Sequence, residues 1–136
     1  LKGYDYSQQG MYFVTVCTNN HHFLFGHITE ERMILNNAGR FANKCWLETP
    51  EHFPHVALDE FIVMPNHIHG IIIINDMNVY NVWQRNYYEH IIRNEKELNK
   101  IREYIMYNPL KWLLDRKNPD RKGREELEDE IFGKSL

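Results

Sequence analysis

The stretch Val56–Ile74, VALDEFIVMPNHIHGIIII, decides how this 136-residue chain folds. Two apolar segments rich in β-branched residues, Val56–Met64 and His67–Ile74, flank the dipeptide Pro65-Asn66, which favours a tight turn. Proline suits the turn because it cannot donate to the hydrogen bonds of a central strand. The pattern therefore predicts an antiparallel hairpin of two long strands.

Further strands and a helix are predicted before the hairpin. The aromatic and β-branched segment Met11–Thr18 is typical of a strand, and Asn19–Gly26 of a loop. Arg32–Leu35 predicts a short strand. Apolar residues then recur at helical spacing over residues 38–49, so a helix is expected there, and Pro50 is expected to end it.

A strand and a helix are also predicted after the hairpin. The polar segment Asn75–Asn81 is a connection, and Val82–Ile92 is aromatic and β-branched enough for a fourth strand. Asn94 resembles an N-cap, with Glu97 three positions later as in a capping box. The helix that begins there must end near Asn108, because the next residue is a proline.

The order of strand, helix, hairpin, strand and helix predicts an α+β fold close to the split βαβ, ferredoxin-like arrangement. We expect an antiparallel sheet with helices packed on one face. Residues 1–136 are expected to form a single domain, with a charged C-terminal tail from about residue 115.

The composition is that of an ordinary globular protein, with 43% hydrophobic and 26% charged residues. The longest dense apolar run, Ile71–Ile74, is far too short to cross a bilayer, so no membrane association is predicted. Cys17 and Cys45 make neither a disulfide framework nor a zinc pattern, which favours a reducing, cytoplasmic setting.

The net charge of -3 argues mildly against a nucleic-acid partner, because phosphate binding usually leaves a basic footprint. Lysines and arginines do gather between residues 116 and 124, but five acidic residues follow between 125 and 130. This run favours a solvated, salt-bridged helix or tail over a DNA-binding patch. Charge alone does not identify the partner.

His67 and His69 lie two apart on a predicted strand, so both imidazoles leave the same face of the sheet. Two nitrogens held close together on a stiff scaffold can form half of a metal site. The alternative is a pair of core histidines hydrogen-bonded to carbonyl groups. Two ligands do not complete a site, so the metal interpretation depends on a third.

The last predicted helix offers Tyr104 and Asn108 at i and i+4, on one face and a turn apart. An amide oxygen is a hard, neutral ligand suited to Mg²⁺ or Mn²⁺. If Asn108 completes the site, the Tyr104 hydroxyl lies near the metal, where a phenol with a pKa near 10 becomes a better nucleophile. The alternative is a packed tyrosine and an asparagine that simply ends the helix before a proline.

Several blocks of the sequence resemble those of one known family. Met64–Gly70 (MPNHIHG) looks like the HUH motif, histidine-hydrophobic-histidine, of the IS200/IS605-type single-tyrosine transposases. Val82–Arg93 (VWQRNYYEHIIR) and Glu103–Pro109 (EYIMYNP) resemble the REP-associated tyrosine transposase branch. Tyr4–Tyr6 and Tyr12–Val16 resemble the opening strand of that family.

The resemblance implies a ferredoxin-like HUH endonuclease domain in which His67, His69 and Asn108 hold Mg²⁺ or Mn²⁺. Family members often have glutamine where this chain has Asn108, and both residues present an amide oxygen. Tyr104, four residues earlier, matches the nucleophile. The implied reaction is cleavage and rejoining of single-stranded DNA beside REP-like or insertion-end hairpins, through a 5′-phosphotyrosine. A homodimer is a further possibility.

Four residues are expected to contact nucleic acid: Trp83, Arg85, Tyr87 and Arg93. Unpaired bases can stack on aromatic rings, and arginines suit phosphates, although the aromatic residues equally suit a core. The chain also departs from the family. Members usually carry a longer stretch, including a helix, between the histidine strand and the Trp-Gln-Arg block, whereas here only residues 75–82 intervene.

Three other functions remain open from the sequence. The first is a domesticated relative that binds hairpin DNA without catalysis, which the intact histidines and tyrosine disfavour. The second is a metal-dependent hydrolase that uses water and forms no covalent adduct. The third is an interaction domain that binds neither metal nor DNA.

Overall fold

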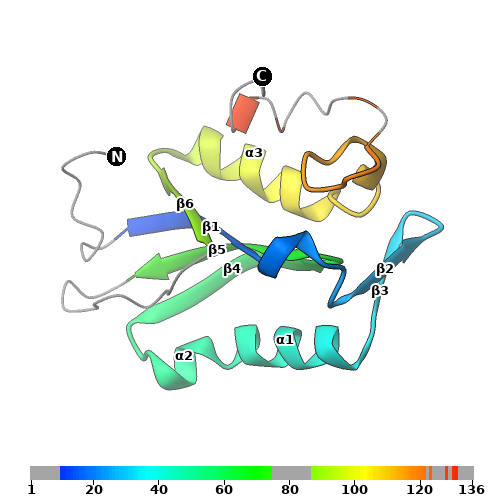
Figure 1. The fold of residues 1–136 in the computed structure, drawn as a ribbon. Coiled ribbons are helices and arrows are strands. Elements are labelled where there is room, and N and C mark those ends of the chain that lie inside the picture. The colour runs from blue at the N-terminus through cyan, green and yellow to red at the C-terminus, as the bar shows by residue number, and fades with distance from the viewer. Residues whose placement is uncertain (1–9, 75–86, 122, 124–127, 129, 132–136) are drawn as a thin grey trace.

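The structure is a computed structural model that describes residues 10–74, 87–121, 123, 128, 130 and 131. Its elements, in chain order, are six strands, three α-helices and two 3₁₀ turns within those residues: β1 (Gly10–Cys17), η1 (Asn19–His21), β2 (Gly26–Thr29), β3 (Arg32–Leu35), α1 (Asn37–Leu47), α2 (Thr49–His52), β4 (Val56–Met64), β5 (His67–Ile74), β6 (Tyr87–Ile92), α3 (Glu95–Met106) and η2 (Trp112–Leu114). Four of the strands form one sheet, which lies between helices (Figure 1).

The main sheet has the strand order β4-β5-β1-β6, and each neighbouring pair is antiparallel. β1 and β4 are joined through α1 and are separated in the sheet by β5, which is the split βαβ arrangement. The predicted α+β fold with an antiparallel sheet is confirmed. The predicted hairpin forms as β4 and β5, with Pro65 and Asn66 in its turn.

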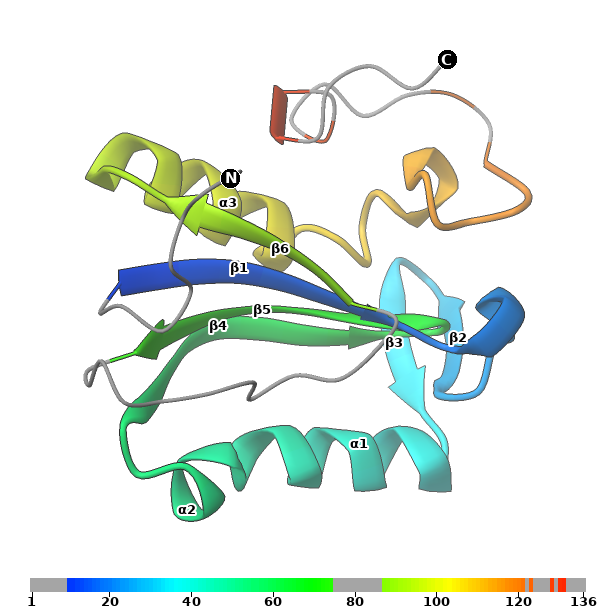
Figure 2. The ribbon, with the colours of Figure 1, turned by 60° about the vertical axis from the view of Figure 1, so that its left-hand side comes forward.

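Helices cover both faces of the sheet, so the expectation that they pack on one face is wrong. Figure 2 shows α3 on one side of the sheet and α1 and α2 on the other. Alternation along β1 explains the two layers, because Phe13 packs in the cluster of α3 and Val14 packs in the cluster of Trp46 from α1. A sheet with two apolar faces needs a cover on each.

Gly70 on β5 allows α1 to lie close to the sheet. A Cβ atom at this position would stand 2.1 Å from Cζ2 of Trp46, which is closer than atoms can approach. The indole therefore occupies the space above the glycine and is itself only 4% exposed. Odd-numbered residues of β5 point to the opposite face, toward α3.

Helix α3 begins as the sequence predicts. The Asn94 side chain accepts a hydrogen bond of 2.8 Å from the backbone N–H of Glu97. The Glu97 carboxylate accepts from the N–H of Arg93 at 3.2 Å, one residue before the usual partner in a capping box. The helix buries Leu98, Ile101, Tyr104 and Ile105 along one stripe.

The region between β1 and β4 differs from the prediction in two ways. Gly26–Thr29, at the end of the expected loop, forms β2 and pairs with β3. Pro50 does not end helical structure, because α1 stops at Leu47 and the proline lies in the first turn of α2. Proline is tolerated there since the first N–H groups of a helix have no partner within it.

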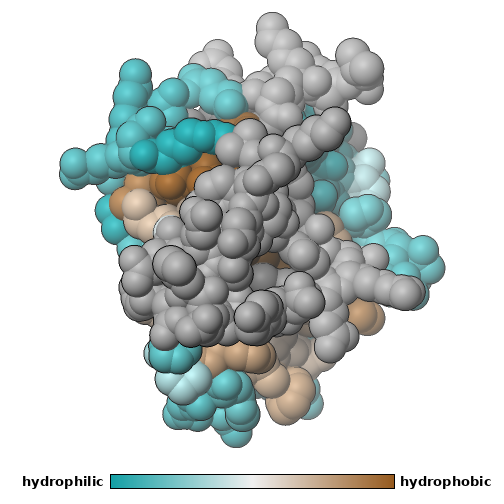
Figure 3. Space-filling view, turned by 90° about the vertical axis from the view of Figure 1, so that its left-hand side faces the viewer, coloured by the Kyte–Doolittle hydropathy of each residue, from teal (hydrophilic) through white to brown (hydrophobic). Residues whose placement is uncertain are grey.

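Figure 3 shows one face of the molecule, with hydrophilic residues at its upper left above a hydrophobic patch, and both kinds of residue together at its lower end. None of the helices in the described part of the chain is long and apolar enough to cross a membrane.

Candidate metal centre and nucleophile

His67 and His69 lie side by side on the face of β5 that α3 covers. Both imidazoles are fully buried, and their ring centroids are 4.4 Å apart. Their partners on β1 are Cys17 and Thr15, so the rings stand over the interior of the sheet rather than over an edge. The prediction that both rings leave one face of the same strand is confirmed.

Each histidine uses its Nδ1 atom in a hydrogen bond within the protein. His67 Nδ1 lies 2.7 Å from Oδ1 of Asn66, and because an amide oxygen can only accept, Nδ1 carries the proton. His69 Nδ1 lies 2.7 Å from the Thr15 hydroxyl. His67 Nε2 is consequently the nitrogen with a lone pair, and it has no hydrogen-bond partner among the residues that the structure describes. This is the state that a metal requires.

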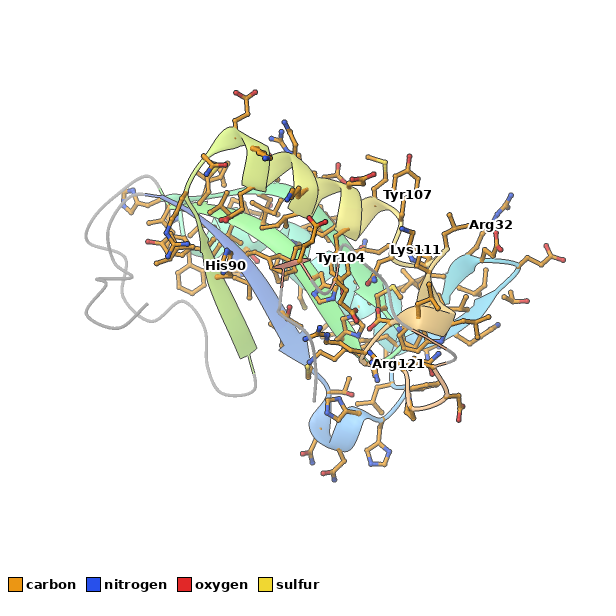
Figure 4. All side chains as sticks on the ribbon, turned by 90° about the horizontal axis from the view of Figure 1, so that it is seen from above. Arg32, His90, Tyr104, Tyr107, Lys111 and Arg121 are labelled. Atoms are coloured by element: carbon orange, nitrogen blue, oxygen red, sulfur yellow. The ribbon has the colours of Figure 1, made fainter. Side chains whose placement is uncertain are left out.

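Tyr104 extends from the last turn of α3 into the same cluster. Its hydroxyl lies 3.2 Å from Nε2 of His69, and its ring stands edge-on to Phe13 with centroids 6.2 Å apart. Only 4% of the residue is exposed. Figure 4, seen from above α3, shows Tyr104 and Tyr107 on opposite sides of the helix. Tyr107 is 44% exposed, so the prediction that it points off the Tyr104 face is confirmed.

Asn108 lies just past the end of α3 and is 2% exposed. Its side-chain Nδ2 donates to Oδ2 of Asp115 at 2.9 Å, while its Oδ1 has no hydrogen-bond partner within the described residues. The same Asp115 oxygen lies 4.0 Å from His67 Nε2. The structure therefore brings an amide oxygen and a carboxylate to the histidine pair, where sequence spacing predicted only the amide.

Ligand atoms of His67, His69 and Asp115 all lie within 4.8 Å of one another, so this buried group could hold a metal ion. Two nitrogens and oxygens from a carboxylate and an amide form a mixed set that divalent cations such as Mn²⁺ accept. Two of the buried polar atoms, His67 Nε2 and Asn108 Oδ1, lack hydrogen-bond partners in the described part of the chain. Because such atoms are costly to bury, a metal fits here.

The C-terminal segment contributes two buried acids to this cluster, while Asp120 and Glu130 of the same segment are exposed. Asp115 and Glu128 are each 1% exposed. Glu128 Oε2 accepts a hydrogen bond of 2.9 Å from the Tyr104 hydroxyl. Asn66 donates to the Lys117 carbonyl at 2.8 Å, which ties the segment to the β4–β5 turn. The expectation of a solvated charge run is wrong for Glu128, whereas Glu130 is exposed and paired with Lys100.

Burial sets the protonation of the cluster. It lowers the pKa of His67 to about 3, with the charge of Lys117 acting in the same direction, and lowers the pKa of His69 well below 6.5. Both rings are therefore neutral, as metal ligands must be. Burial, followed by the charges of Asp115 and Glu128, raises the pKa of Tyr104 well above 10.0. The protonated phenol needs nearby positive charge to become nucleophilic.

Burial, and then the charge of Glu128, raise the pKa of Asp115 from 3.8 to about 7. Between these two values the folded protein holds a proton that the unfolded chain releases, so the stability contributed by Asp115 falls as the pH rises through this window. We expect Asp115→Asn, measured in EDTA, to raise the melting temperature by several degrees at about pH 8 and to leave it unchanged at about pH 4.

Glu130→Gln is the control for this melting experiment, because Glu130 is on the same segment but its side chain is 53% exposed. The histidines are common to all variants, so their titration cancels in the comparison. An equal shift of Asp115→Asn at both pH values would mean that the carboxyl is not the titrating group.

A small cavity lies against the Tyr104 ring, with about 10 Å³ of free volume, which is room for one water molecule. It is lined by Glu103, Tyr104, Tyr107, Asn108, Lys111, Asp115 and Glu128. A phosphodiester group does not fit this volume. The substrate of any reaction at Tyr104 must therefore displace part of the lining.

Most of the residues expected to contact nucleic acid lie outside the part of the chain that the structure describes. Trp83 and Arg85 lie outside the described residues, as does the side chain of Tyr87. Arg93 is exposed and directly precedes Asn94, the N-cap of α3. The short connection predicted at residues 75–82 also lies outside the described part of the chain.

No family model matches the sequence. An uncharacterized protein of Haemophilus influenzae is 37% identical over 159 residues, which cover 85% of this chain and 88% of that protein. The chain belongs to the family of that protein. The aligned stretch exceeds the 136 residues of this chain, so the relative carries internal residues that have no counterpart here.

Two further matches share one description. A second Haemophilus influenzae protein, named “Putative REP-associated tyrosine transposase”, is 50% identical over 30 residues, or 22% of this chain and 17% of that protein. A solved structure of a REP-associated tyrosine transposase bound to a REP hairpin superposes with a TM-score of 0.57 at 22% identity. It covers 82% of this chain and 74% of that one, and it shows that the two proteins share a fold.

Proposed function

We propose that this chain is a metal-dependent tyrosine transposase or nuclease that cleaves and rejoins single-stranded DNA beside hairpins. The observation that carries the proposal is the 3.2 Å contact between the Tyr104 hydroxyl and His69 Nε2, inside a buried cluster that could hold a metal. Tyrosine nucleophiles need a positive charge at the reacting oxygen, and this cluster can provide one. The shared fold with a hairpin-bound transposase supports the hairpin as partner.

His67, His69 and Asn108 would hold Mg²⁺ or Mn²⁺, with Asp115 either joining them or orienting the Asn108 amide through its 2.9 Å hydrogen bond. A bound ion would polarise a non-bridging oxygen of the scissile phosphate. Asn66 and Thr15 keep the two imidazoles in place from behind, through their 2.7 Å contacts with the Nδ1 atoms. The site is thus held by strand, turn and helix together.

In the proposed reaction the Tyr104 oxygen attacks phosphorus and the bond from phosphorus to the 3′ oxygen breaks. The phenolic proton passes to solvent, and the departing 3′ oxygen takes a proton from solvent. One phosphodiester is exchanged for another, a 5′-phosphotyrosine, so the free 3′-hydroxyl can later reverse the step without an external energy source. The covalent phosphotyrosine intermediate distinguishes strand transfer from hydrolysis, which forms no such intermediate.

The deciding experiment is incubation of the chain with 3′-end-labelled, hairpin-containing single-stranded DNA and Mn²⁺, followed by denaturing electrophoresis, because the 3′ label stays on the fragment that Tyr104 would hold. A labelled band at the mass of protein plus DNA supports the tyrosine mechanism. Free 5′-phosphate product without such a band identifies a hydrolase. Binding without either product identifies the non-catalytic hairpin-binding alternative. That alternative is compatible with the low exposure of Tyr104, 4%, because a buried hydroxyl does not reach a bound strand.

Asn108 gives a graded test of the metal ligands. Asn108→Gln retains an amide oxygen and should keep partial cleavage, whereas Asn108→Leu retains none and should lose it. We expect Asn108→Leu to weaken Mn²⁺ binding by at least about 10–100-fold, measured by titration calorimetry. If wild type and Asn108→Leu bind Mn²⁺ with equal affinity, Asn108 is not a ligand and Asp115 is the third one.

A further inference from the structure

The Glu128 carboxylate lies in a ring of N–H donors and positive charge. The backbone N–H of Arg116 donates to both of its oxygens, at 2.9 and 3.2 Å. The Arg116 side-chain Nε lies 3.1 Å from Oε1, and a terminal nitrogen of Arg121 lies 3.6 Å from the same oxygen. The carboxylate is buried, while the two arginine side chains are 20% and 24% exposed. Figure 4 shows Arg121 on the segment that follows α3.

These donors suit a phosphate as well as they suit a carboxylate. A backbone N–H with two guanidinium groups provides several charge-assisted hydrogen bonds, which favour an anion with two or more acceptor oxygens. A phosphodiester presents two non-bridging oxygens and one negative charge. The site around Glu128 therefore has the chemistry of a phosphodiester site, with a side-chain carboxylate of the same chain bound in it.

This anion site lies directly beside the Tyr104 hydroxyl. Glu128 Oε2 is 2.9 Å from the Tyr104 hydroxyl, and a phosphate about to react must stand about 3–3.5 Å from its nucleophile. The carboxylate and the phosphate cannot both be there, because two negative charges repel and the adjoining cavity holds only about 10 Å³.

We propose that Arg116 and Arg121, with the backbone N–H of Arg116, form a binding site for a DNA phosphate beside Tyr104, which the Glu128 carboxylate fills until DNA displaces it. The inference rests on the proposed function, since it takes nucleic acid as the ligand. The proposed site gives Arg116 and Arg121 a role in DNA binding, which the net charge of -3 does not indicate.

The test measures DNA binding apart from chemistry. A fluorescent single-stranded oligonucleotide of mixed sequence is titrated into the full chain carrying Tyr104→Phe, in EDTA, and anisotropy is recorded at several salt concentrations. Glu128→Gln should bind about tenfold tighter, because the competing charge is gone, and the slope of log K against log salt should steepen by about 1. Arg121→Gln should bind about tenfold weaker, with a slope shallower by about 1.

Lys100 and Glu130 supply matched controls, because they form an ion pair of 2.8 Å with side chains that are 42% and 53% exposed. Glu130→Gln and Lys100→Gln make the same changes in net charge and should alter binding by no more than about twofold. Arg121→Gln serves as the independent variant if Glu128→Gln does not fold, since Arg121 is partly exposed.

Two results would overturn the phosphate site. One is Glu128→Gln binding no tighter than Glu130→Gln, with Arg121→Gln also unchanged. The other, in the Tyr104-containing chain with Mn²⁺, is loss of the covalent adduct by Glu128→Gln at unchanged DNA affinity, which would make Glu128 the proton acceptor of Tyr104. If the parent chain binds neither this oligonucleotide nor one that contains a hairpin, the proposed function itself fails.

Discussion

Tyr104→Phe should bind hairpin DNA with nearly unchanged affinity and form no covalent adduct, a loss of at least about 10³-fold in trapped product. The substitution removes one oxygen and keeps the ring that packs edge-on against Phe13. It also removes the 2.9 Å hydrogen bond to Glu128, whose carboxylate keeps its bonds from the Arg116 N–H. The cost in stability should be about 1 kcal/mol. Adduct formation is read by denaturing electrophoresis, and folding by thermal melting.

Tyr107→Phe is the matched control, because Tyr107 lies at the end of the same helix but is 44% exposed on another side. It should retain the adduct, as should Phe substitutions at Tyr87 and Tyr88. If Tyr104→Phe still forms the adduct and one of these variants does not, the nucleophile is misassigned. Cleavage by all four variants without any trapped protein would identify water as the nucleophile.

The hairpin, the histidine face and the start of α3 could be predicted because each depends on local signals. Pro65-Asn66 between two β-branched runs defines the turn, and a period of two places both imidazoles on one face. Asn94 and Glu97 mark the helix start in the sequence and make the expected hydrogen bond in the structure. The spacing of Tyr104 and Asn108 predicts one helix face; in the structure both are buried at the cluster, although Asn108 lies just past the end of α3.

The two-sided packing of the sheet could not be predicted with the same certainty. Strands β1 and β5 are apolar at consecutive positions, which indicates burial on both faces. The path of the chain between strands decides which helix covers which face of the sheet. The hydrophobic pattern of a single strand or helix gives no information about that path. Gly70 gives a local hint, since an absent side chain in an isoleucine-rich strand suits the close approach of Trp46.

Asp115 and Glu128 were missed because they reach the site from a segment without regular periodicity. Glu128 meets Tyr104 across 24 positions of sequence, and its neighbours in the chain are acidic residues typical of a solvated surface. Their burial follows from contacts that only the folded chain makes, such as the bond from Asn66 to the Lys117 carbonyl. Asn66 and Thr15 lay within the predicted turn and strand. No sequence pattern, however, indicates that their side chains contact the Nδ1 atoms of the two histidines.

His67→Ala and His69→Ala should each abolish Mn²⁺ binding and DNA cleavage while leaving a folded protein. Each removes one nitrogen from a site that has only one other imidazole, and a hard cation held by the remaining donors is readily lost to water. Truncating a fully buried ring should cost about 1–3 kcal/mol, less than the roughly 5–15 kcal/mol that keeps a domain folded. Part of that cost is offset for His67, whose buried Nε2 lacks a hydrogen-bond partner among the described residues.

Thermal melting separates metal binding from catalysis in these variants. Mn²⁺ at about 100 times its Kd should stabilise the wild-type protein by about 2.7 kcal/mol, and this gain should be absent in both variants. His90→Ala is the control, because His90 pairs with Glu97 near the start of α3 and its side chain is 25% exposed. Undiminished cleavage by His69→Ala, or undiminished cleavage by the wild-type protein in EDTA, would contradict the metal site. A metal-induced shift that survives in His67→Ala and disappears in Asp115→Asn would place the ion on the carboxylate instead, and the histidines would then be core residues held by Asn66 and Thr15.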